Sequence, residues 1–549
     1  MLEVGPAGVK EVRSSSFNEA ALALMGIPAG GGPAPATRIA IGFADYGFDL
    51  LHPCLRNAAG DRSRFCFLWD QNQTPAPART PDLDVTSVED WDGGALDSAV
   101  REAAASGSRR ALDARYDPHA NNCGRNGTIG AAHGTMMASI AAGTAFAGFR
   151  SAAPDAALIG VQLALLDPDW KEEDAHGRPT WLDAPLPTDT TWPGWRSYDD
   201  AAQIGNAIRY IYDRACRIDV DALVINLSIG AWAGAHDDAS AAERTIAQLA
   251  ASADAAWAAG RGPRTIIVAG AGNAGADEGH WTGIVTRDAA QTFDWIMQRD
   301  DPTQNKLEIW YDANDPLDVG LGLPDGTTLN LTRDATHEIT TGAARIGIAD
   351  HTIRARGSLS RLRLLLHPPL FPPGLFDSAA ATTSFSIHLR ARRASAKAHA
   401  WIERDDGLRE RSWLSPSHPE NSLCCLASAG GALVVAGCDH RRQPVAGQPA
   451  ILPQSSLGPS PWRDGVAGRV PHVTAPAAAI WGARSKSRGF AQTTGTSAAV
   501  ALASGAIAYA LARDPRTTLP PHALQMGWNS RFGFGLLSID DNVATGGFA

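Results

Sequence analysis

The chain has 549 residues, enough for roughly two to four average domains or for one large enzyme domain with additions. With 44% hydrophobic and 19% charged residues, 55 glycines and 35 prolines, its composition is typical of a folded, loop-rich protein and excludes a disordered or fibrous chain. The formal charge of −10 and the lack of a long lysine or arginine run argue against nucleic acid as a partner.

The first predicted element is a short helix at 17–25, before a flexible joint rich in glycine and proline at 30–35. The ordered core is therefore expected to start near Thr37. Residues 1–16 contain no continuous apolar stretch, so no signal peptide is expected. The predicted location is the cytoplasm, with non-classical export as the alternative.

After Thr37, apolar runs typical of strands alternate with helical patterns. Strands are predicted at 38–44, 157–163, 222–228 and 265–269, and helices at 133–142, 199–215 and 241–259. Continuous apolar strands separated by helices indicate a parallel sheet that is covered on both faces. We therefore predict an α/β fold with a doubly wound parallel sheet.

The residue pattern changes near residue 280, where polar segments typical of strands replace the helical patterns. These segments lie at 307–311, 327–331, 344–348, 362–366 and 384–389. They predict an inserted all-β domain, a sandwich, at 280–428, before the α/β pattern returns at 432–438. The predicted domains are an N-terminal tail at 1–36, an α/β domain at 37–279 and 429–549, and the insertion at 280–428.

The last strong apolar run, Ala498 to Ala512, is too short and too rich in alanine to span a bilayer, so it predicts a buried helix and no membrane partner. The seven cysteines are an odd number without any C-x-x-C spacing. This pattern predicts reduced, mostly buried thiols rather than a disulfide framework or a zinc cluster.

Four short motifs at strand ends and helix starts contain residues that can carry chemistry. Asp45 ends an apolar strand in Ala-Asp-Tyr-Gly, and His133 opens a helix of small residues in His-Gly-Thr. Asn273 follows a strand in Gly-Ala-Gly-Asn, and Ser497 precedes the buried helix in Gly-Thr-Ser. Each residue alone is more often structural, as a loop aspartate, a capping histidine, a turn or an N-cap serine.

Taken together, the four residues supply the parts of nucleophilic catalysis. A serine hydroxyl is a poor nucleophile unless an imidazole accepts its proton, and the imidazole needs a buried carboxylate that fixes its tautomer. The tetrahedral intermediate also needs hydrogen-bond donors for its oxyanion, which the Asn273 amide and the Ser497 backbone N–H can provide. We therefore expect Ser497 as nucleophile, His133 as base, Asp45 as its orienting group and Asn273 in the oxyanion hole.

The order Asp, His, Asn, Ser with these motifs resembles the subtilase family, peptidase family S8, whereas other serine hydrolases have different orders. Supporting matches are Asn226-Leu-Ser-Ile-Gly230 and Pro471-His-Val-Thr-Ala-Pro476. The resemblance implies a subtilisin-type fold, protein or peptide substrates and no cofactor. It also implies that substrate backbone binds along Ser228, Ile229 and Gly230, with Ala269, Gly270 and Ala271 on the opposite side.

Within the family, the sequence is most similar to the spore-germination subtilases that carry a jelly-roll insertion. The matching segments are 52–57, 68–71, 234–237 and 307–311. The chain departs from the usual pattern at Met136-Met137, and Trp232 follows the substrate segment, so specificity cannot be transferred from relatives. No metal site is assigned, because the cluster Asp312, Asn314, Asp315 and Asp318 lacks the EF-hand spacing and such clusters usually form turns.

Three functions follow from these residues, and the favoured one is a serine endopeptidase acting through an acyl-enzyme. The second is a pseudoprotease that serves as a binding or regulatory scaffold, since a fold does not guarantee turnover. The third is a serine hydrolase acting on a non-peptide ester. We also expect that the β insertion recruits a protein partner.

Overall fold

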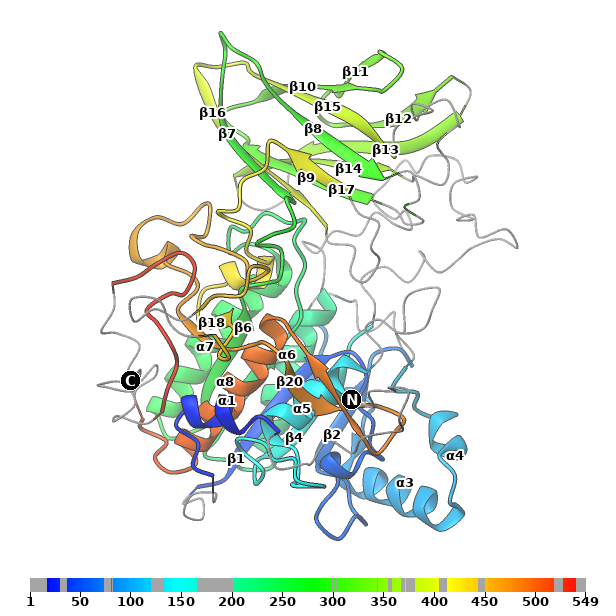
Figure 1. Ribbon diagram of the computed structural model, residues 1–549, viewed down its shortest axis with the longest axis vertical. Helices are drawn as coiled ribbons and strands as arrows, with labels where there is room; N and C mark the ends of the chain where they lie inside the picture. The colour runs from blue at the N-terminus through cyan, green and yellow to red at the C-terminus, as the bar shows by residue number, and fades with distance from the viewer. Residues whose placement is uncertain are drawn as a thin grey trace.

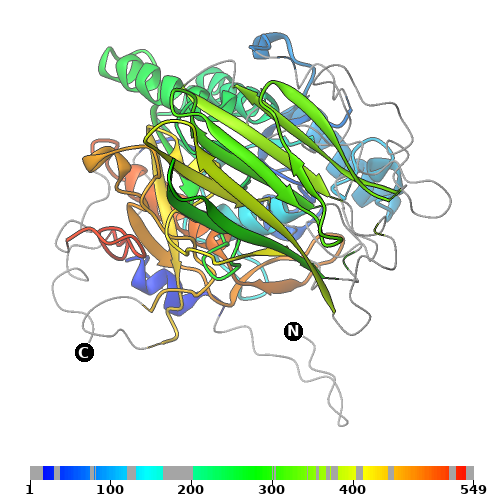
Figure 2. The ribbon, with the colours of Figure 1, turned by 90° about the horizontal axis from the view of Figure 1, so that it is seen from above.

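The computed structural model describes residues 17–29, 37–73, 80, 82–119, 132–164, 202–298, 301, 305–342, 344–353, 358–366, 371, 381–403, 412–442, 450–517 and 527–539. Two parts are stacked along the long axis of the molecule (Figure 1): an α/β body with the labelled helices, and two antiparallel sheets above it. Seen from above, the sheets lie over the α/β body (Figure 2).

An eight-stranded sheet forms the centre of the α/β part, in the order β19-β18-β6-β5-β1-β4-β2-β3. Its strands are β1 (Ile39–Asp45), β2 (Phe65–Asp70), β3 (Trp91–Asp92), β4 (Ala157–Gln162), β5 (Ala222–Leu227), β6 (Arg264–Gly270), β18 (Ala432–Cys438) and β19 (Val473–Pro476). Every neighbouring pair is parallel except β2 with the short edge strand β3. The predicted doubly wound parallel sheet is therefore confirmed.

Helices cover both faces of this sheet, as the alternation of β1 shows. Ile39, Ile41 and Phe43 pack in one core with α5 (His133–Ala142) and α8 (Thr496–Leu511). Ala40 and Ala44 pack in the other core with α6 (Ala202–Arg217) and α7 (Ala241–Ala258). Successive strand residues point to opposite faces, so a continuous apolar strand serves both cores at once. The helix expected at 199–215 matches α6 from residue 202 on, and residues 199–201 lie outside the described part.

Helix α8 is apolar on all sides and passes through the middle of the α/β part. Fourteen of its sixteen residues are buried, which confirms the buried helix predicted from the run that begins at Ala498. No helix in the described ranges has the length and apolarity needed to cross a bilayer. The smaller elements nearby are α3 (Gly93–Ser106), α4 (Arg110–Asp113) and the hairpin of β20 (Ile480–Ala483) and β21 (Phe490–Thr493).

The short helix α1 (Glu19–Leu24) belongs to the main core, so the expectation that the ordered core starts near Thr37 is wrong. Leu22 and Met25 are buried beside α5 and α8. The side-chain amide of Asn18 exchanges two hydrogen bonds of 2.8 Å with the backbone of Trp481. Only tertiary contacts reveal this role, because a six-residue helix carries too little periodic signal to show which core it joins.

The insertion connects β6 to β18, which are neighbours in the large sheet. Its first sheet has the order β11-β10-β15-β8-β17 and its second the order β12-β13-β14-β9-β16-β7. The strands are β7 (His280–Thr286), β8 (Gln291–Gln298), β9 (Asn305–Asp312), β10 (Leu317–Gly322), β11 (Thr328–Asn330), β12 (Ala335–Thr341), β13 (Ala344–Ile353), β14 (Leu359–Leu366), β15 (Thr382–Ala391), β16 (Ser395–Ile402) and β17 (Ser412–Ser415). The two antiparallel sheets share one apolar core, as a sandwich does.

The domain limits predicted at 279 and 428 stay predictions, but two packing facts bear on them. All strands of the two antiparallel sheets lie between residues 280 and 415. Residues 423–427, which the prediction assigned to the insertion, pack in the α/β core with α7 and β6.

One face of the six-stranded sheet contacts the α/β part along β16. Along β16, Ala396, Ala398 and Ala400 point into the sandwich core. The alternate residues Lys397 and Trp401 point the other way, where Lys397 Nζ donates to the carbonyl of residue 461 at 2.6 Å and Trp401 packs in a separate cluster with residues 235 and 310. The part of this face along β16 is therefore in contact with the α/β part.

Candidate active site

The predicted chemical residues gather at one edge of the large sheet. Strands β6, β5 and β1 are adjacent and parallel, so their carboxyl ends lie side by side. Asp45 is the last residue of β1, Ser228 follows β5, and Asn273 lies three residues after β6. Helices α5 and α8 begin at His133 and just before Ser497, and α8 packs on all three strands. Ligands of open α/β sheets bind at this edge.

Asp45 and His133 form a close pair at this edge. His133 Nδ1 lies 2.8 Å and 3.0 Å from the two carboxylate oxygens of Asp45, whose side chain is fully buried. A carboxylate only accepts hydrogen bonds, so Nδ1 carries the proton in the neutral imidazole. Nε2 on the far side of the ring is then the unprotonated nitrogen that can accept a proton.

The loop after β1 fixes this pair by supporting the start of α5. The first N–H groups of a helix have no partner within it, and here Gly134 N–H donates to the carbonyl of Tyr46 and Thr135 N–H to that of Gly47, both at 2.9 Å. Gly47 has φ 71°, and a Cβ there would lie 1.9 Å from the carbonyl oxygen of residue 118, so only glycine fits. Thr135 Oγ1 also accepts the N–H of Asp49 at 2.7 Å. These contacts, which hold His133, come from the α/β part.

Asn273 is held by the start of α8. Its Oδ1 accepts the backbone N–H of Thr496 at 2.8 Å and the hydroxyl of the same residue at 3.1 Å. With the amide oxygen fixed in this way, the orientation of Nδ2 is fixed as well. Gly495 lets the two segments approach, because a Cβ there would lie 3.2 Å from Oδ1 and 3.3 Å from Nδ2.

Ser497 is partly exposed, in the first turn of α8. Its Oγ donates a hydrogen bond of 2.9 Å to the backbone carbonyl of Ser228. Ser228 Oγ donates to Asn226 Oδ1 at 2.8 Å, and Asn226 Nδ2 donates to Ser504 Oγ, farther along α8, at 3.0 Å. A buried polar chain therefore locks the end of β5 to α8 and fixes Ser497 relative to the predicted substrate segment.

The predicted substrate residues differ in their accessibility. Gly230 is exposed and Ile229 partly exposed, whereas Ala269 and Ala271 are buried. The Ala271 N–H donates to the carbonyl of residue 435 at 2.9 Å, and its own carbonyl accepts the N–H of Cys424 at 2.8 Å. Its backbone is thus already paired, and the role of 269–271 in binding substrate stays a prediction.

Two side chains occupy the space between these segments. Cys424 Sγ donates to the carbonyl of Gly270 at 3.1 Å, and a Cβ added to Gly230 would lie 3.1 Å from Cys424 Cβ. The indole of Trp232 lies against both sides, since a Cβ at Gly230 or at Gly272 would be 3.3 Å and 3.1 Å from its ring atoms. Burial raises the pKa of Cys424 to about 12, so this thiol stays protonated and acts as a packing group.

Glu403 is the residue near the site that sequence reasoning missed. It follows β16 of the insertion, and its carboxylate accepts the backbone N–H groups of Trp232 and Ala233, each at 3.1 Å. Burial raises the pKa of this carboxyl, while the positive charge of Lys306 acts in the opposite direction. The alternation of alanine with lysine, histidine and tryptophan along 395–402 was the available signal for a strand with one polar, buried face.

The cysteines and the acidic cluster at 312–318 lie outside the predicted chemical residues, and their contacts are those of packing groups and turns. All cysteines in the described ranges are free thiols: Cys54, Cys424, Cys425 and Cys438 are buried, Cys66 is partly buried and Cys216 is exposed. Cys123 lies outside the described ranges. In the acidic cluster, Asp312 accepts the N–H of Asn314 at 2.8 Å and Asp318 pairs with Arg392 at 2.6 Å.

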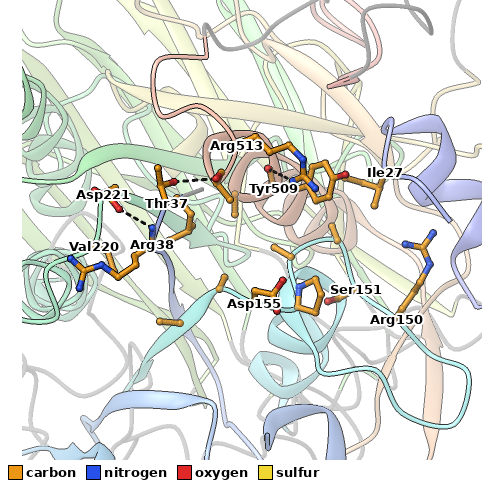
Figure 3. Close-up of a pocket in the computed structure, with 18 of the residues that line it drawn as sticks. Ile27, Thr37, Arg38, Arg150, Ser151, Asp155, Val220, Asp221, Tyr509 and Arg513 are labelled. Carbon is orange, nitrogen blue, oxygen red and sulfur yellow. Dashed lines mark hydrogen bonds between the residues drawn. The ribbon is translucent and has the colours of Figure 1, made fainter. Parts of the chain in front are cut away.

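A cavity of about 810 Å³ lies at the opposite edge of the sheet (Figure 3). It is bounded by the residues that precede β1 and β5, including Thr37 and Asp221, and by Tyr509 and Arg513 near the end of α8. β1 rises about 3.3 Å per residue, so the cavity is about 20 Å from Asp45. It is separate from the candidate active site.

Comparison with known proteins identifies the family. The model of the subtilase family matches residues 36–527, so the chain belongs to the subtilases, which are serine proteases. The chain is similar to the CspB protease of Clostridium perfringens, with 17% identity and a TM-score of 0.63 over 96% of each chain. It is also similar to the S41 psychrophilic protease, with 14% identity and a TM-score of 0.42 over 96% of this chain and 100% of the other. A search of curated proteins by sequence finds no match.

These similarities confirm the family and the fold class that the motifs predicted. At such identities the structural likeness establishes the fold alone. The roles of the individual side chains follow from the contacts described above and from chemistry.

Proposed function

We propose that the chain is a serine endopeptidase that cleaves extended segments of proteins or peptides through an acyl-enzyme on Ser497. The observation that carries the proposal is the bond from His133 Nδ1 to the buried carboxylate of Asp45 at 2.8 Å. A buried carboxylate beside an imidazole at the substrate edge of the sheet stabilises the imidazolium that forms when serine loses its proton. The cytoplasmic location expected from the sequence stays a prediction.

In the proposed reaction, Ser497 Oγ leaves the carbonyl of Ser228 and donates its proton to His133 Nε2 while it attacks the substrate carbonyl. The C–O bond that forms converts the carbonyl to an oxyanion, which Asn273 Nδ2 and the Ser497 backbone N–H stabilise. The imidazolium then protonates the leaving amine as the C–N bond breaks. Water then attacks the resulting ester while His133 accepts a proton from it. The imidazolium returns this proton to Ser497 Oγ as the bond between the acyl carbon and the serine oxygen breaks.

Asn273 suits its proposed role because its oxygen is already occupied. Both hydrogen bonds from Thr496 end on Oδ1, so the amide cannot rotate without losing them. The donor Nδ2 is thereby preorganised, and a preorganised donor costs no reorientation as charge develops.

The bond from Ser497 Oγ to the carbonyl of Ser228 favours a second candidate, a pseudoprotease. A hydroxyl that always donates to a backbone carbonyl is not activated by an imidazole. The two candidates differ in whether Ser497 is more reactive than an ordinary serine.

Labelling with a fluorophosphonate probe at neutral pH distinguishes the two candidates. An active peptidase forms a stoichiometric adduct that peptide mapping places on Ser497, and Ser497→Ala abolishes it. Ser252→Ala, on the exposed side of α7, is the matched control and should label like the unchanged protein. A folded protein that cleaves no casein and forms no adduct would falsify the peptidase proposal and support the scaffold.

A further inference from the structure

In the described part of the inserted domain, the side chain of Glu403 reaches the turn that follows the substrate segment of the α/β part. Glu403 Oε1 lies 3.1 Å from the N–H nitrogen of Trp232, and Oε2 lies 3.1 Å from that of Ala233. These two peptide groups begin two residues after Gly230, the exposed end of the predicted substrate segment. One carboxylate from the insertion thus binds two consecutive N–H groups of the turn that follows the segment.

The strand end that carries Glu403 is itself fixed. Its backbone N–H donates to the carbonyl of Lys306 on β9 at 2.9 Å. Two residues earlier, Trp401 stacks on His236 of the α/β part with ring centroids 4.2 Å apart, and its indole N–H donates to the carbonyl of Asn421 at 2.9 Å. The carboxylate is therefore a rigid extension of the insertion.

The turn that Glu403 binds also determines the shape of the site. Trp232 carries one of the two bound N–H groups, and its indole lies against Gly230 on one side and Gly272 on the other. Gly272 immediately precedes Asn273. Fixing the Trp232 backbone therefore fixes the distance between the substrate segment and the loop that leads to the proposed oxyanion hole.

We propose that Glu403 is a positioning residue, through which the insertion holds Ser228 to Gly230 in the conformation that pairs with an extended substrate backbone. This inference rests on the proposed function, because it names what the insertion does for that site. Glu403 touches no reacting atom in this scheme. It acts through Trp232 and Ala233 on the binding of the peptide.

Loss of the carboxylate should weaken peptide binding and leave the reactive groups in place. The Asp45 to His133 pair and the Asn273 amide are held by residues 46–49 and by Thr496, through hydrogen bonds in which Glu403 takes no part. A small ester makes no backbone pairing, so its turnover reports on the nucleophile alone. An unfolded casein chain needs both parts of the site.

The test uses the full chain with Glu403→Ala and Glu403→Gln, and Glu338→Ala as the control at an exposed glutamate of the same domain. For each variant, kcat and KM are measured with fluorescein-labelled casein and with p-nitrophenyl acetate, and the rate of fluorophosphonate labelling is followed. Casein binding is measured separately by anisotropy in the Ser497→Ala background, which needs no turnover.

For Glu403→Ala we expect KM for casein, and its Kd, to rise about tenfold, with ester turnover and labelling within about twofold of the unchanged protein. Glu403→Gln should recover part of the loss, because the amide oxygen can still accept one N–H. If the alanine variant does not fold, the glutamine variant carries the test, with an expected rise of about threefold.

Equal casein affinity in all variants would overturn the inference, and so would a proportional loss of ester and casein turnover. The result separates the two proposals. Casein binding that depends on Glu403 in a protein that never labels would refute the peptidase and keep the positioning role. If the protein labels but its casein affinity does not depend on Glu403, the peptidase proposal is kept and the positioning role is refuted.

Discussion

The two halves of the candidate site are held by different parts of the molecule. The Asp45 to His133 pair depends on contacts within the α/β part, where the loop at 46–49 binds the first turn of α5. The substrate half at Ser228 to Ala233 is bound from the insertion by Glu403.

This difference separates chemistry from recognition. The hydrogen bonds described for the reacting groups join residues of the α/β part, so they can form within that part. In the substrate half, the hydrogen bonds from Glu403 require a correctly packed insertion, in addition to the bonds that Ser228 makes within the α/β part. Changes in the first half should therefore affect kcat, whereas changes in the second should affect KM and specificity.

The largest effect is expected for Asp45→Asn. This variant tests whether turnover can be lost while substrate binding is kept. Asparagine would favour the wrong imidazole tautomer, and the expected loss of turnover is about 10⁴, a size carried over from other triads, including that of a subtilisin. Casein affinity in the Ser497→Ala background should not change. Asp61→Asn, at an exposed site, is the control, and normal turnover by Asp45→Asn would contradict the triad.

Asn273→Ala should lower kcat by about 10²–10³, a range measured for the oxyanion-hole asparagine of a subtilisin and carried over to this chain. The Thr496 N–H also loses its acceptor, which should lower the free energy of unfolding by about 1 kcal/mol. Thr496→Val is the matched variant, because it removes the 3.1 Å hydroxyl bond but keeps the N–H bond. Comparable kcat values for the two variants would show that Asn273 only caps α8.

Acidification should weaken the packing between the insertion and the α/β part. Burial lowers the pKa of His236 to about 4 and that of His280 to about 3, and burial also lowers the pKa of His399 well below its usual value. All three rings lie between the insertion and the α/β part, stacked on Trp401.

The direction in which the free energy of unfolding changes with pH follows from the protons bound by each state. Below pH 6.5 the unfolded chain binds protons at these histidines that the folded chain does not, so the free energy of unfolding falls as pH decreases from 6.5 toward 4. Each histidine contributes on the order of 1.4 kcal/mol per pH unit in this window. Calorimetry at pH 7, 6 and 5 should show this fall, and His236→Gln should flatten it. An unchanged slope in that variant would exclude His236 as a contributor.

The smallest effect is expected for Trp232→Ala, which alters specificity. Removing the indole opens space between Gly230 and Gly272, so cleavage after larger apolar residues should increase about three- to tenfold. Mass spectrometry of casein fragments measures the change. Trp257→Ala, at an exposed tryptophan of α7, is the control, and an unaltered fragment pattern would show that the indole does not limit the pocket.

Local sequence determined much of this molecule. The strands at 39–45, 222–227 and 264–270 were predictable because buried parallel strands are continuous apolar runs. The placement of the four predicted residues at one edge of the sheet was predictable because they follow strands or open helices, and parallel strands bring such positions together. The pairing of Asp45 with His133, 88 residues apart, agrees with that expectation.

Tertiary structure alone decided the rest, because those contacts join residues that no local pattern relates. Glu403 binds a turn 171 residues earlier, and Asn18 binds a hairpin 463 residues later. Cys424 lies between the two predicted substrate segments because 423–427 packs with the α/β core. A periodic pattern shows which face of an element is buried, but only the packed chain determines what that face contacts.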